Sequence, residues 1–258
     1  MHKTGKWEEG YFGGSDYEIL EGTPGQRIID WYADFLVDAL GLKPGCRVLD
    51  CGSGRGHYAM ALAKRGCNVT GVDVSEYMIE KGLRLAREET RLTIIKMDFR
   101  RMTFRDEFDA VVSISNSLGY GTREDDAEAI RCMVRALKPG GMLLVDLHNL
   151  ACYRTKYQGQ RWWHETAEEF ILSTVKYEEA EQRLICRDVI VPKTGGLPRE
   201  YPSSFKEYPP AEIQAVLEGA GLRDIVFYGD ACTTDAGPLF SEPGFNERSN
   251  VMIVTGMR

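Results

Sequence analysis

The segment from Arg47 to Arg65, RVLDCGSGRGHYAMALAKR, is the feature that most constrains the fold of this 258-residue chain. Val48 and Leu49 form a short apolar run that leads to Asp50, and such runs are typical of buried parallel strands. Glycines at positions 52, 54 and 56 follow, and apolar residues at helical spacing come next. A strand, a glycine turn and a helix bring backbone N–H groups and the positive end of a helix close to a ligand. The segment therefore predicts a small-molecule site at the carboxyl end of a strand.

Beyond this segment, strand-like and helix-like patterns alternate along the chain. Apolar runs typical of strands recur at 68–74, 92–97, 108–115, 142–147, 223–228 and 250–256. Segments with apolar residues at helical spacing separate most of these runs. Another helix is expected before the first strand, with Thr23 as its N-cap and Pro24 at its first position. The alternation predicts an α/β fold with a doubly wound, mostly parallel, seven-stranded sheet.

The alternation stops between about 150 and 207. Runs of strand composition occur there at 169–177, 183–191 and 203–208, with polar or glycine turns between them, such as the one at 194–196. Closely spaced strands of this kind predict antiparallel pairing. We therefore expect an inserted antiparallel β region that lies over the open end of the sheet.

The composition argues against several classes of function. Lysine and arginine number 32 against 39 aspartates and glutamates, a net charge of −7 that does not suit a nucleic-acid binder. The seven cysteines never have CxxC spacing, so reduced thiols are expected rather than disulfides or a metal site. The N-terminus has no apolar signal region, and no 18-residue apolar run occurs. A cytoplasmic protein without a membrane segment is expected, as a monomer or homodimer.

The glycine spacing distinguishes between two kinds of nucleotide site. A dinucleotide fingerprint reads G-x-G-x-x-G, and this chain has His57 in place of the third glycine. Asp50 in front of the loop repels a pyrophosphate, but its carboxylate accepts hydrogen bonds from an ammonium group. Asp73 ends the second strand, where a carboxylate takes both hydroxyls of a ribose. Asp98, beside Phe99, ends the third strand and could accept from an adenine amine. Three such acids suit S-adenosylmethionine (SAM), a cationic nucleoside without phosphate.

At these residues the chain resembles the class I SAM-dependent methyltransferases. The segments that carry the resemblance are VLDCGSGRG, VTGVDVSEYMIEKG, the MDFRRM stretch, FDAVVSISNSLGY and LKPGGMLLVDLHN, in the family's order over about residues 45–150, with AEIQAVLEGAGL extending it. The branch it resembles acts on small molecules and has a β insertion after the fifth strand. The resemblance implies a Rossmann-like fold and transfer of a methyl group to an N or O atom of a small-molecule acceptor. The transfer would be an in-line displacement, with S-adenosylhomocysteine as product.

The resemblance also implies an organisation of the chain and a set of cofactor residues. Residues 1–44 would form an N-terminal lid and helix, 45–149 the SAM-binding core, 150–207 the insertion over the acceptor site, and 208–258 the final helix and strands. The residues implied for the cofactor are Tyr11, Asp50, Gly52, Ser53, Gly54, Asp73, Val74, Met78, Met97, Asp98, Phe99 and Ser115. Base-modifying N-methyltransferases carry an Asn/Asp-Pro-Pro-aromatic stretch after the fourth strand, but this chain has SNSL at 115–118. Nucleic-acid bases are therefore not expected as acceptors.

The reaction itself requires little from the protein beyond positioning. A sulfonium is an activated methyl donor, so alignment of the nucleophile and exclusion of water account for much of the rate. His148, at the end of the fifth strand, is the first candidate for a general base, and the alternative is a histidine that bonds to the backbone. The resemblance implies that Tyr17, in the same lid as Tyr11, lies near the methyl group; ordinary surface aromatics are the alternative. Trp162 and Trp163 either line the acceptor pocket or form the core of the insertion.

Three other functions remain open at this stage. A protein that binds SAM without turnover has the same cofactor site, because a fold does not establish catalysis. A nicotinamide oxidoreductase is disfavoured by His57 in the glycine loop. A protein or RNA methyltransferase lacks a basic surface here but could act through a docking partner.

Overall fold

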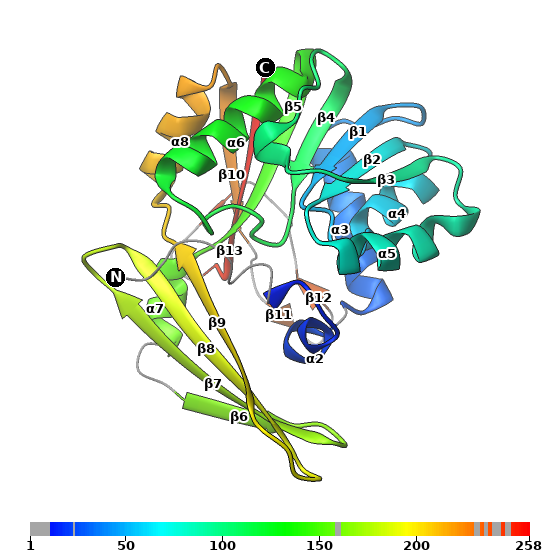
Figure 1. Cartoon of the computed structure of the whole chain (residues 1–258). Helices are drawn as coiled ribbons and strands as arrows, with labels where there is room; N and C mark the ends of the chain where they lie inside the picture. Colours follow the sequence, from blue (N-terminus) through cyan, green and yellow to red (C-terminus); the bar gives the residue numbers. More distant parts are fainter. Residues whose placement is uncertain are drawn as a thin grey trace. The chain divides into compact units, whose positions relative to one another are not determined.

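The structure is a computed structural model, drawn in Figure 1. It describes residues 11–22, 24–157, 161–229, 233–234, 237–238, 244–245 and 249–258. These residues fall into two compact units. The core unit comprises 24–149 and the described residues from 208 to 258. The inserted unit comprises 11–22 and the described residues from 150 to 207, so it joins two segments that are far apart in the sequence.

The core unit is built on a seven-stranded sheet in the order β10-β13-β5-β4-β1-β2-β3. Its strands are β1 (Arg47–Cys51), β2 (Asn68–Asp73), β3 (Leu92–Lys96), β4 (Phe108–Ser113), β5 (Leu137–His148), β10 (Arg223–Gly229) and β13 (Val251–Met257). All the strands run in one direction except β13, which is antiparallel to both of its neighbours. The expected α/β fold with a mostly parallel, seven-stranded sheet is therefore confirmed.

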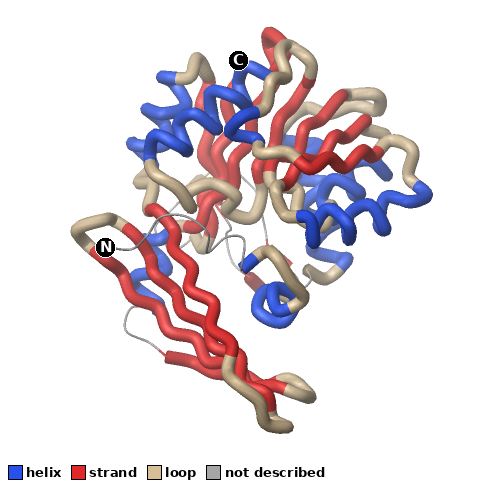
Figure 2. Tube along the Cα trace, viewed as in Figure 1, coloured by secondary structure: helices blue, strands red, loops and turns tan. Residues whose placement is uncertain are grey.

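Helices cover both faces of this sheet (Figure 2). The helices are α3 (Gln26–Ala39), α4 (His57–Lys64), α5 (Glu76–Leu85), α6 (Arg123–Ala136) and α8 (Pro210–Gly219), with the short 3₁₀ helices η1 (Ala86–Glu88) and η2 (Phe99–Arg101). Successive strand residues point to opposite faces, so Val48 packs in the core beneath α3 and α4 while Leu49 packs in the core beneath α6 and α8. Burial on both faces explains why the central strands are continuously apolar.

The first of these helices begins later than expected. Gly25 is the N-cap of α3 and has an extended conformation, with φ −60° and ψ 145°. The prediction of Pro24 as the first helical residue is therefore wrong by two positions, and Thr23 lies outside the described residues. The buried face of the helix starts at Ile29, and Ile28 is 42% exposed. The first turn of the helix, before Ile29, is therefore exposed.

The inserted unit contains a four-stranded antiparallel sheet in the order β6-β7-β8-β9. Its elements are α2 (Asp16–Glu21), α7 (Leu150–Tyr157), β6 (Arg161–Glu165), β7 (Glu169–Glu178), β8 (Arg183–Pro192) and β9 (Arg199–Lys206). The expected antiparallel region is confirmed, although its last strand begins four residues before the expected start at 203. Helices α2 and α7 and strand β6 were not expected.

Two further observations limit what the fold contains. The short strands β11 (Thr233–Thr234) and β12 (Gly237–Pro238) pair with each other in a separate two-stranded sheet. No helix in the described part of the chain has the length and apolar character needed to cross a membrane.

Candidate functional site

The glycine loop between β1 and α4 is fastened to the end of β2. The N–H groups of Gly52 and Ser53 donate to the Val72 carbonyl at 2.9 and 3.0 Å, and Gly54 N–H donates to the Asp73 carboxylate at 2.9 Å. Gly52 has φ +77°, and a Cβ there would lie 2.5 Å from Ser117 Oγ. Glycine is required at this position both for its backbone conformation and for the close approach of the next loop.

Asp50 lies behind this loop, with only 3% of its surface exposed. Burial, together with the nearby negative charge of Asp73, raises its pKa to about 7. No hydrogen bond from another described residue reaches the Asp50 carboxylate. A buried carboxylate without a donor is costly unless a cation or a hydrogen-bond donor meets it. The surroundings of Asp50 therefore favour a positively charged ligand group.

Asp73, at the end of β2, is partly satisfied by the backbone. Its two carboxylate oxygens accept from Ser75 N–H at 2.8 Å and from Gly54 N–H at 2.9 Å. Burial raises its pKa, although these hydrogen bonds act in the opposite direction. Each oxygen of a carboxylate has about two acceptor positions. The backbone N–H of Val74 also contributes a hydrogen bond to this carboxylate. Asp73 can therefore hold the loop and still offer an acceptor position to a ligand hydroxyl.

Asp98 differs from the other two acids because a cation already neutralises it. Arg100 donates to both of its oxygens at 2.9 Å, and Asp98 also caps η2 through the Arg100 N–H. Burial raises the pKa of Asp98, but the bonds from Arg100 outweigh burial and hold that pKa below its ordinary value. Phe99 is part of η2, and its ring would lie 3.6 Å from a Cβ on Gly52. The Phe99 ring therefore adjoins the glycine loop.

The other residues expected at the cofactor vary in exposure. Val74 is 52% exposed at the end of β2, whereas Met78 is 3% exposed in the first turn of α5. The N–H of Met97 donates to the Asp73 carbonyl at 2.8 Å. Ser53 packs against Gly71, where a Cβ would lie 2.8 Å from its hydroxyl oxygen. The structure thus brings all of these residues to the carboxyl ends of β1, β2 and β3.

The loop after β4 has an unusual backbone. Ser115 and Asn116 have φ values of +58° and +56°, which is uncommon for two consecutive residues that are not glycine. Asn116 is 6% exposed, its N–H donates to the Asp146 carbonyl at 3.1 Å, and its side-chain oxygen accepts from the His148 N–H at 2.9 Å. Strained backbone of this kind is held by its surroundings and clusters at functional sites.

Asp146 of β5 links this loop to α3, because its carboxylate accepts hydrogen bonds from both. Its carboxylate is 6% exposed, accepts from Tyr32 OH at 2.8 Å and also accepts a long hydrogen bond of 3.4 Å from Ser115 N–H. The Tyr58 hydroxyl bonds to the Ser115 side chain, and burial followed by the charge of Asp146 raises its pKa to about 12. Sequence reasoning missed Asn116, Asp146, Tyr32 and Tyr58. The polar run at 115–117 after a buried strand was the one available signal.

His148 ends β5 and lies next to this loop. Its backbone pairs with Val251 of β13. Burial lowers the pKa of its imidazole to about 4, so the ring is neutral at pH 7. A neutral imidazole can accept a proton, but a pKa this low makes it a weak base.

The aromatic residues expected near the acceptor belong to the inserted unit. Tyr11 is 4% exposed, and its ring contacts Phe12 and Tyr17 at centroid distances of 5.1 and 5.8 Å. Trp163 is 63% exposed in β6, so the interpretation that it forms the core of the insertion is wrong. The side chain of Trp162 lies outside the described residues.

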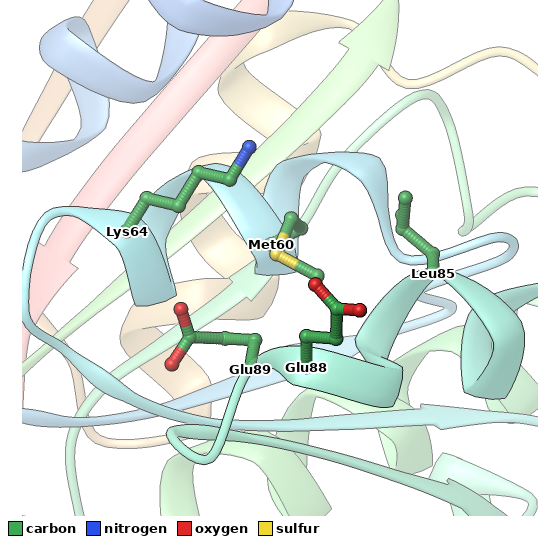
Figure 3. A pocket seen from close by; sticks show the side chains of 5 residues that line it. All are labelled: Met60, Lys64, Leu85, Glu88 and Glu89. Carbon is green, nitrogen blue, oxygen red and sulfur yellow. The ribbon is translucent and has the colours of Figure 1, made fainter.

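Two other features do not contribute to the site. Within the described ranges, no group of three His, Cys, Asp or Glu side chains is arranged to hold a metal ion. Figure 3 shows a surface pocket of about 240 Å³ lined by Met60, Lys64, Leu85, Glu88 and Glu89. These residues come from the later part of α4 and from the end of α5 with η1, which lead into β2 and β3. The pocket therefore lies at the amino ends of these strands, whereas Asp50, Asp73 and Asp98 lie at the carboxyl ends of the strands.

Comparison with known proteins identifies the region that carries these motifs. Residues 48–141 match the family described as "Methyltransferase domain". This region is a methyltransferase domain. It contains the glycine loop, Asp50, Asp73, Asp98 and the loop after β4.

Curated relatives match mainly over the same domain. YqeM of Bacillus subtilis strain 168, named as a methyltransferase, is 37% identical over 105 residues, which cover 40% of this chain and 42% of the relative. A sterol 24-C-methyltransferase, erg6 of Aspergillus fumigatus, is 34% identical over 130 residues, which cover 48% of this chain and 33% of the relative. The chain thus spans less than half the length of these two relatives.

Solved structures match over nearly the whole chain. The CcbJ methyltransferase from Streptomyces caelestis has a TM-score of 0.78 at 22% identity and covers 95% of this chain and 96% of its own. SAM-bound CalS10, an amino pentose methyltransferase from Micromonospora echinaspora, has a TM-score of 0.66 at 16% identity, covering 94% of this chain and 97% of its own. The methyltransferase domain therefore has the class I, Rossmann-like fold, as expected from the resemblance.

Proposed function

We propose that this protein is a SAM-dependent methyltransferase that acts on a small-molecule acceptor and releases S-adenosylhomocysteine. The observation that carries the proposal is Asp50, a buried carboxylate without a hydrogen bond from a described residue, directly behind a glycine loop. A diphosphate would bring more negative charge to this place, whereas the ammonium of SAM would neutralise it. The match to the methyltransferase domain family supports the same cofactor.

The residues at the strand ends fit the parts of SAM in turn. Asp50 would accept from the ammonium group, and the loop at Gly52 and Gly54 would allow the methionine part to approach the backbone. Asp73 would accept from a ribose hydroxyl with its remaining acceptor position. Asp98 and Phe99 would contact the adenine, with an exposed apolar surface on Val74 beside them. Tyr11, Ser53, Met78, Met97 and Ser115 complete the proposed cofactor set.

The bound cofactor would supply an activated methyl group, so the protein must position the acceptor and exclude water. We place this work at the ends of β4 and β5 and in the inserted unit. Tyr17, His148, Trp162 and Trp163 are the proposed acceptor residues, and Tyr17 and His148 are the proposed catalytic ones. With a pKa of about 4, His148 would receive a proton only transiently or would orient a nucleophile that arrives unprotonated.

We propose an N or O atom as the methyl acceptor. The polar groups of Ser115, Asn116 and His148 around the proposed acceptor side support this choice, because they can hydrogen-bond an amine or hydroxyl. CalS10 is described as an amino pentose methyltransferase, and an amino pentose carries both amine and hydroxyl groups, which agrees with an N or O acceptor. The erg6 relative is named for a carbon acceptor, so methylation of carbon is the competing outcome.

The test is a methyl-transfer assay with SAM labelled on its methyl group, run over a panel of amines, phenols, carboxylates and sterols. Labelled product from an amine or phenol, together with S-adenosylhomocysteine, is the expected result. Labelled product from a sterol alone would contradict an N or O acceptor and indicate methylation of carbon. Tight SAM binding with no labelled product from any class would favour a SAM-binding protein without turnover, which the low pKa of His148 also allows.

A further inference from the structure

A charged cluster in the inserted unit joins the N-terminal segment to strand β9. Arg199 donates through Nε to one oxygen of Asp16 at 2.5 Å and through its terminal nitrogen to the other at 3.1 Å. The Tyr201 hydroxyl donates to Asp16 as well. These partners are 183 and 185 positions apart in the sequence. The contacts therefore hold together two segments that lie far apart in the sequence.

The geometry of this cluster favours a strong interaction. The same terminal nitrogen of Arg199 donates to Glu169 of β7 at 2.7 Å, so two carboxylates share one guanidinium. The side chains of Asp16 and Glu169 are only 16% and 14% exposed. Burial raises the pKa of Asp16, but its bonds to Arg199 and Tyr201 outweigh burial and keep that pKa below the ordinary value. Paired donors on a carboxylate are stronger than a single exposed ion pair.

Asp16 is next to Tyr17, one of the two tyrosines proposed to act in the site. Helix α2 has only six residues, too few to be stable without tertiary contacts. Tyr17 also packs on Tyr11 and on Phe12, at centroid distances of 5.8 and 5.3 Å. The contacts of Asp16 therefore attach the segment that carries these rings to strand β9 of the inserted sheet.

We propose that Arg199 is a positioning residue that sets the placement of Tyr11 and Tyr17 by holding Asp16. The N-terminal segment and the inserted sheet then act as one body, although the whole methyltransferase domain separates them in the sequence. The positioning role rests on the proposed function, because it assumes that Tyr17 lies near the methyl group. The attachment of the segment to the sheet does not depend on that assumption.

The attachment is tested by hydrogen exchange in the full-length protein. Arg199→Met removes the guanidinium but keeps a long side chain, and Asp16→Asn weakens the same contacts from the other side. Arg187→Met is the matched control, because Arg187 makes a similar pair with Glu200 at 2.5 and 2.7 Å on the same sheet and no hydrogen bond or ion pair with the described residues 11–22. Both test variants should exchange amides in 15–22 at least tenfold faster than wild type, and the control should not. Unchanged exchange in both would overturn the proposal.

The positioning role is tested by kinetics with an acceptor found in the methyl-transfer assay. Arg199→Met should lower kcat roughly 10- to 100-fold and leave the Kd for SAM within about twofold, since misplaced catalytic groups cost rates of this size. Arg199→Lys, which keeps the charge but loses the paired geometry, should recover part of kcat. Faster exchange with an unchanged kcat would overturn the positioning role. If wild type binds no SAM, the proposed function fails while the exchange result still stands.

Discussion

At the scale of single residues, Asp50 links the stability of the protein to its proposed function. Its pKa of about 7 means that the folded protein holds a proton which the unfolded chain releases near pH 4. The free energy of unfolding therefore falls as the pH rises from about 4 to about 7. A bound ammonium would remove the penalty, which is how a site can be unfavourable for the empty protein and favourable for the complex.

Asp50→Asn should separate these two effects. The amide carries no charge, so the free energy of unfolding of the ligand-free variant should exceed that of wild type at pH 8 and approach it at pH 4. The difference at pH 8 is on the order of 4 kcal/mol at most, because burial raises the pKa of Asp50 from 3.8 to about 7. Urea titrations at several pH values measure it.

Asp109→Asn is the matched control for this experiment. Lys138 and the Arg47 N–H bind the Asp109 carboxylate, and although burial raises its pKa, these partners hold it below the ordinary value. Its contribution to stability is present above its unfolded pKa and is lost as the pH falls, so the control should be less stable than wild type at pH 8. An Asp50→Asn difference that does not change with pH would contradict the account.

The Tyr32–Asp146 hydrogen bond gives a second prediction at this scale. Tyr32→Phe should lower the free energy of unfolding by about 1–3 kcal/mol, because it removes one hydrogen-bond donor from the buried carboxylate of Asp146. Tyr228→Phe is the control, since Tyr228 makes a ring contact with Phe35 at 5.4 Å and no side-chain hydrogen bond within the described ranges. Chemical denaturation measures the free energy of unfolding of both variants. Equal losses in the two would show that the Tyr32–Asp146 hydrogen bond does not stabilise the protein.

At the scale of elements, local sequence patterns predicted the strands of the large sheet but missed elements that have little periodic pattern. The sheet strands were predictable because continuous apolar runs reflect burial on both faces. Helix α7 was missed because its eight residues, LACYRTKY, show no apolar face at helical spacing. Strand β6 was missed because five residues between turns carry too little pattern.

The candidate site divides in the same way. Asp50, Asp73 and Asp98 could be found because each follows an apolar run directly, at the end of a strand or just beyond it. Asp146 lies within an apolar strand, and its partner Tyr32 is 114 positions away. The role of Asn116 depends on a backbone conformation and on a bond from the β5 backbone. Neither can be read from local sequence.

The glycine loop provides a prediction for an element as a whole. Gly52→Ala should destabilise the protein more than Gly54→Ala, although both glycines have positive φ values, +77° and +53°. Alanine at either position has an unfavourable backbone, at a cost of about 1–2 kcal/mol. Only at position 52 would the new Cβ also overlap Ser117, whereas position 54 faces open space.

Thermal unfolding of the two variants measures this difference. Adding Ser117→Gly to Gly52→Ala removes the overlapping atoms and should restore part of the lost stability. If the two alanine variants unfold alike, the close approach of the two loops is not a constraint on the fold.

At the scale of the whole molecule, the proposed cofactor residues and the proposed acceptor residues lie mostly in different units. All the proposed cofactor residues except Tyr11 belong to the core unit, and the inserted unit holds three of the four proposed acceptor residues. If this division holds, relatives with different acceptors would still match over the cofactor-binding residues, and the two curated relatives do match mainly over the methyltransferase domain. The division would also allow cofactor binding and acceptor choice to be altered separately.

The division predicts where a bound cofactor changes hydrogen exchange. S-adenosylhomocysteine should slow exchange at 52–56 and 73–75, because its binding there would stabilise the closed loop. The turn at 179–182 between β7 and β8 serves as the internal control and should not change. Slowing confined to the inserted unit would contradict the proposed placement of the cofactor.

We propose that acids at adjacent strand ends recognise a cationic nucleoside. Isothermal titration of the protein with SAM tests this recognition, with wild type, Asp50→Asn and Asp73→Ala measured at pH 8. We expect one SAM per chain for wild type, a loss of at least tenfold in affinity for each variant, and no heat with NADH. No heat with SAM, or wild-type affinity in both variants, would contradict it.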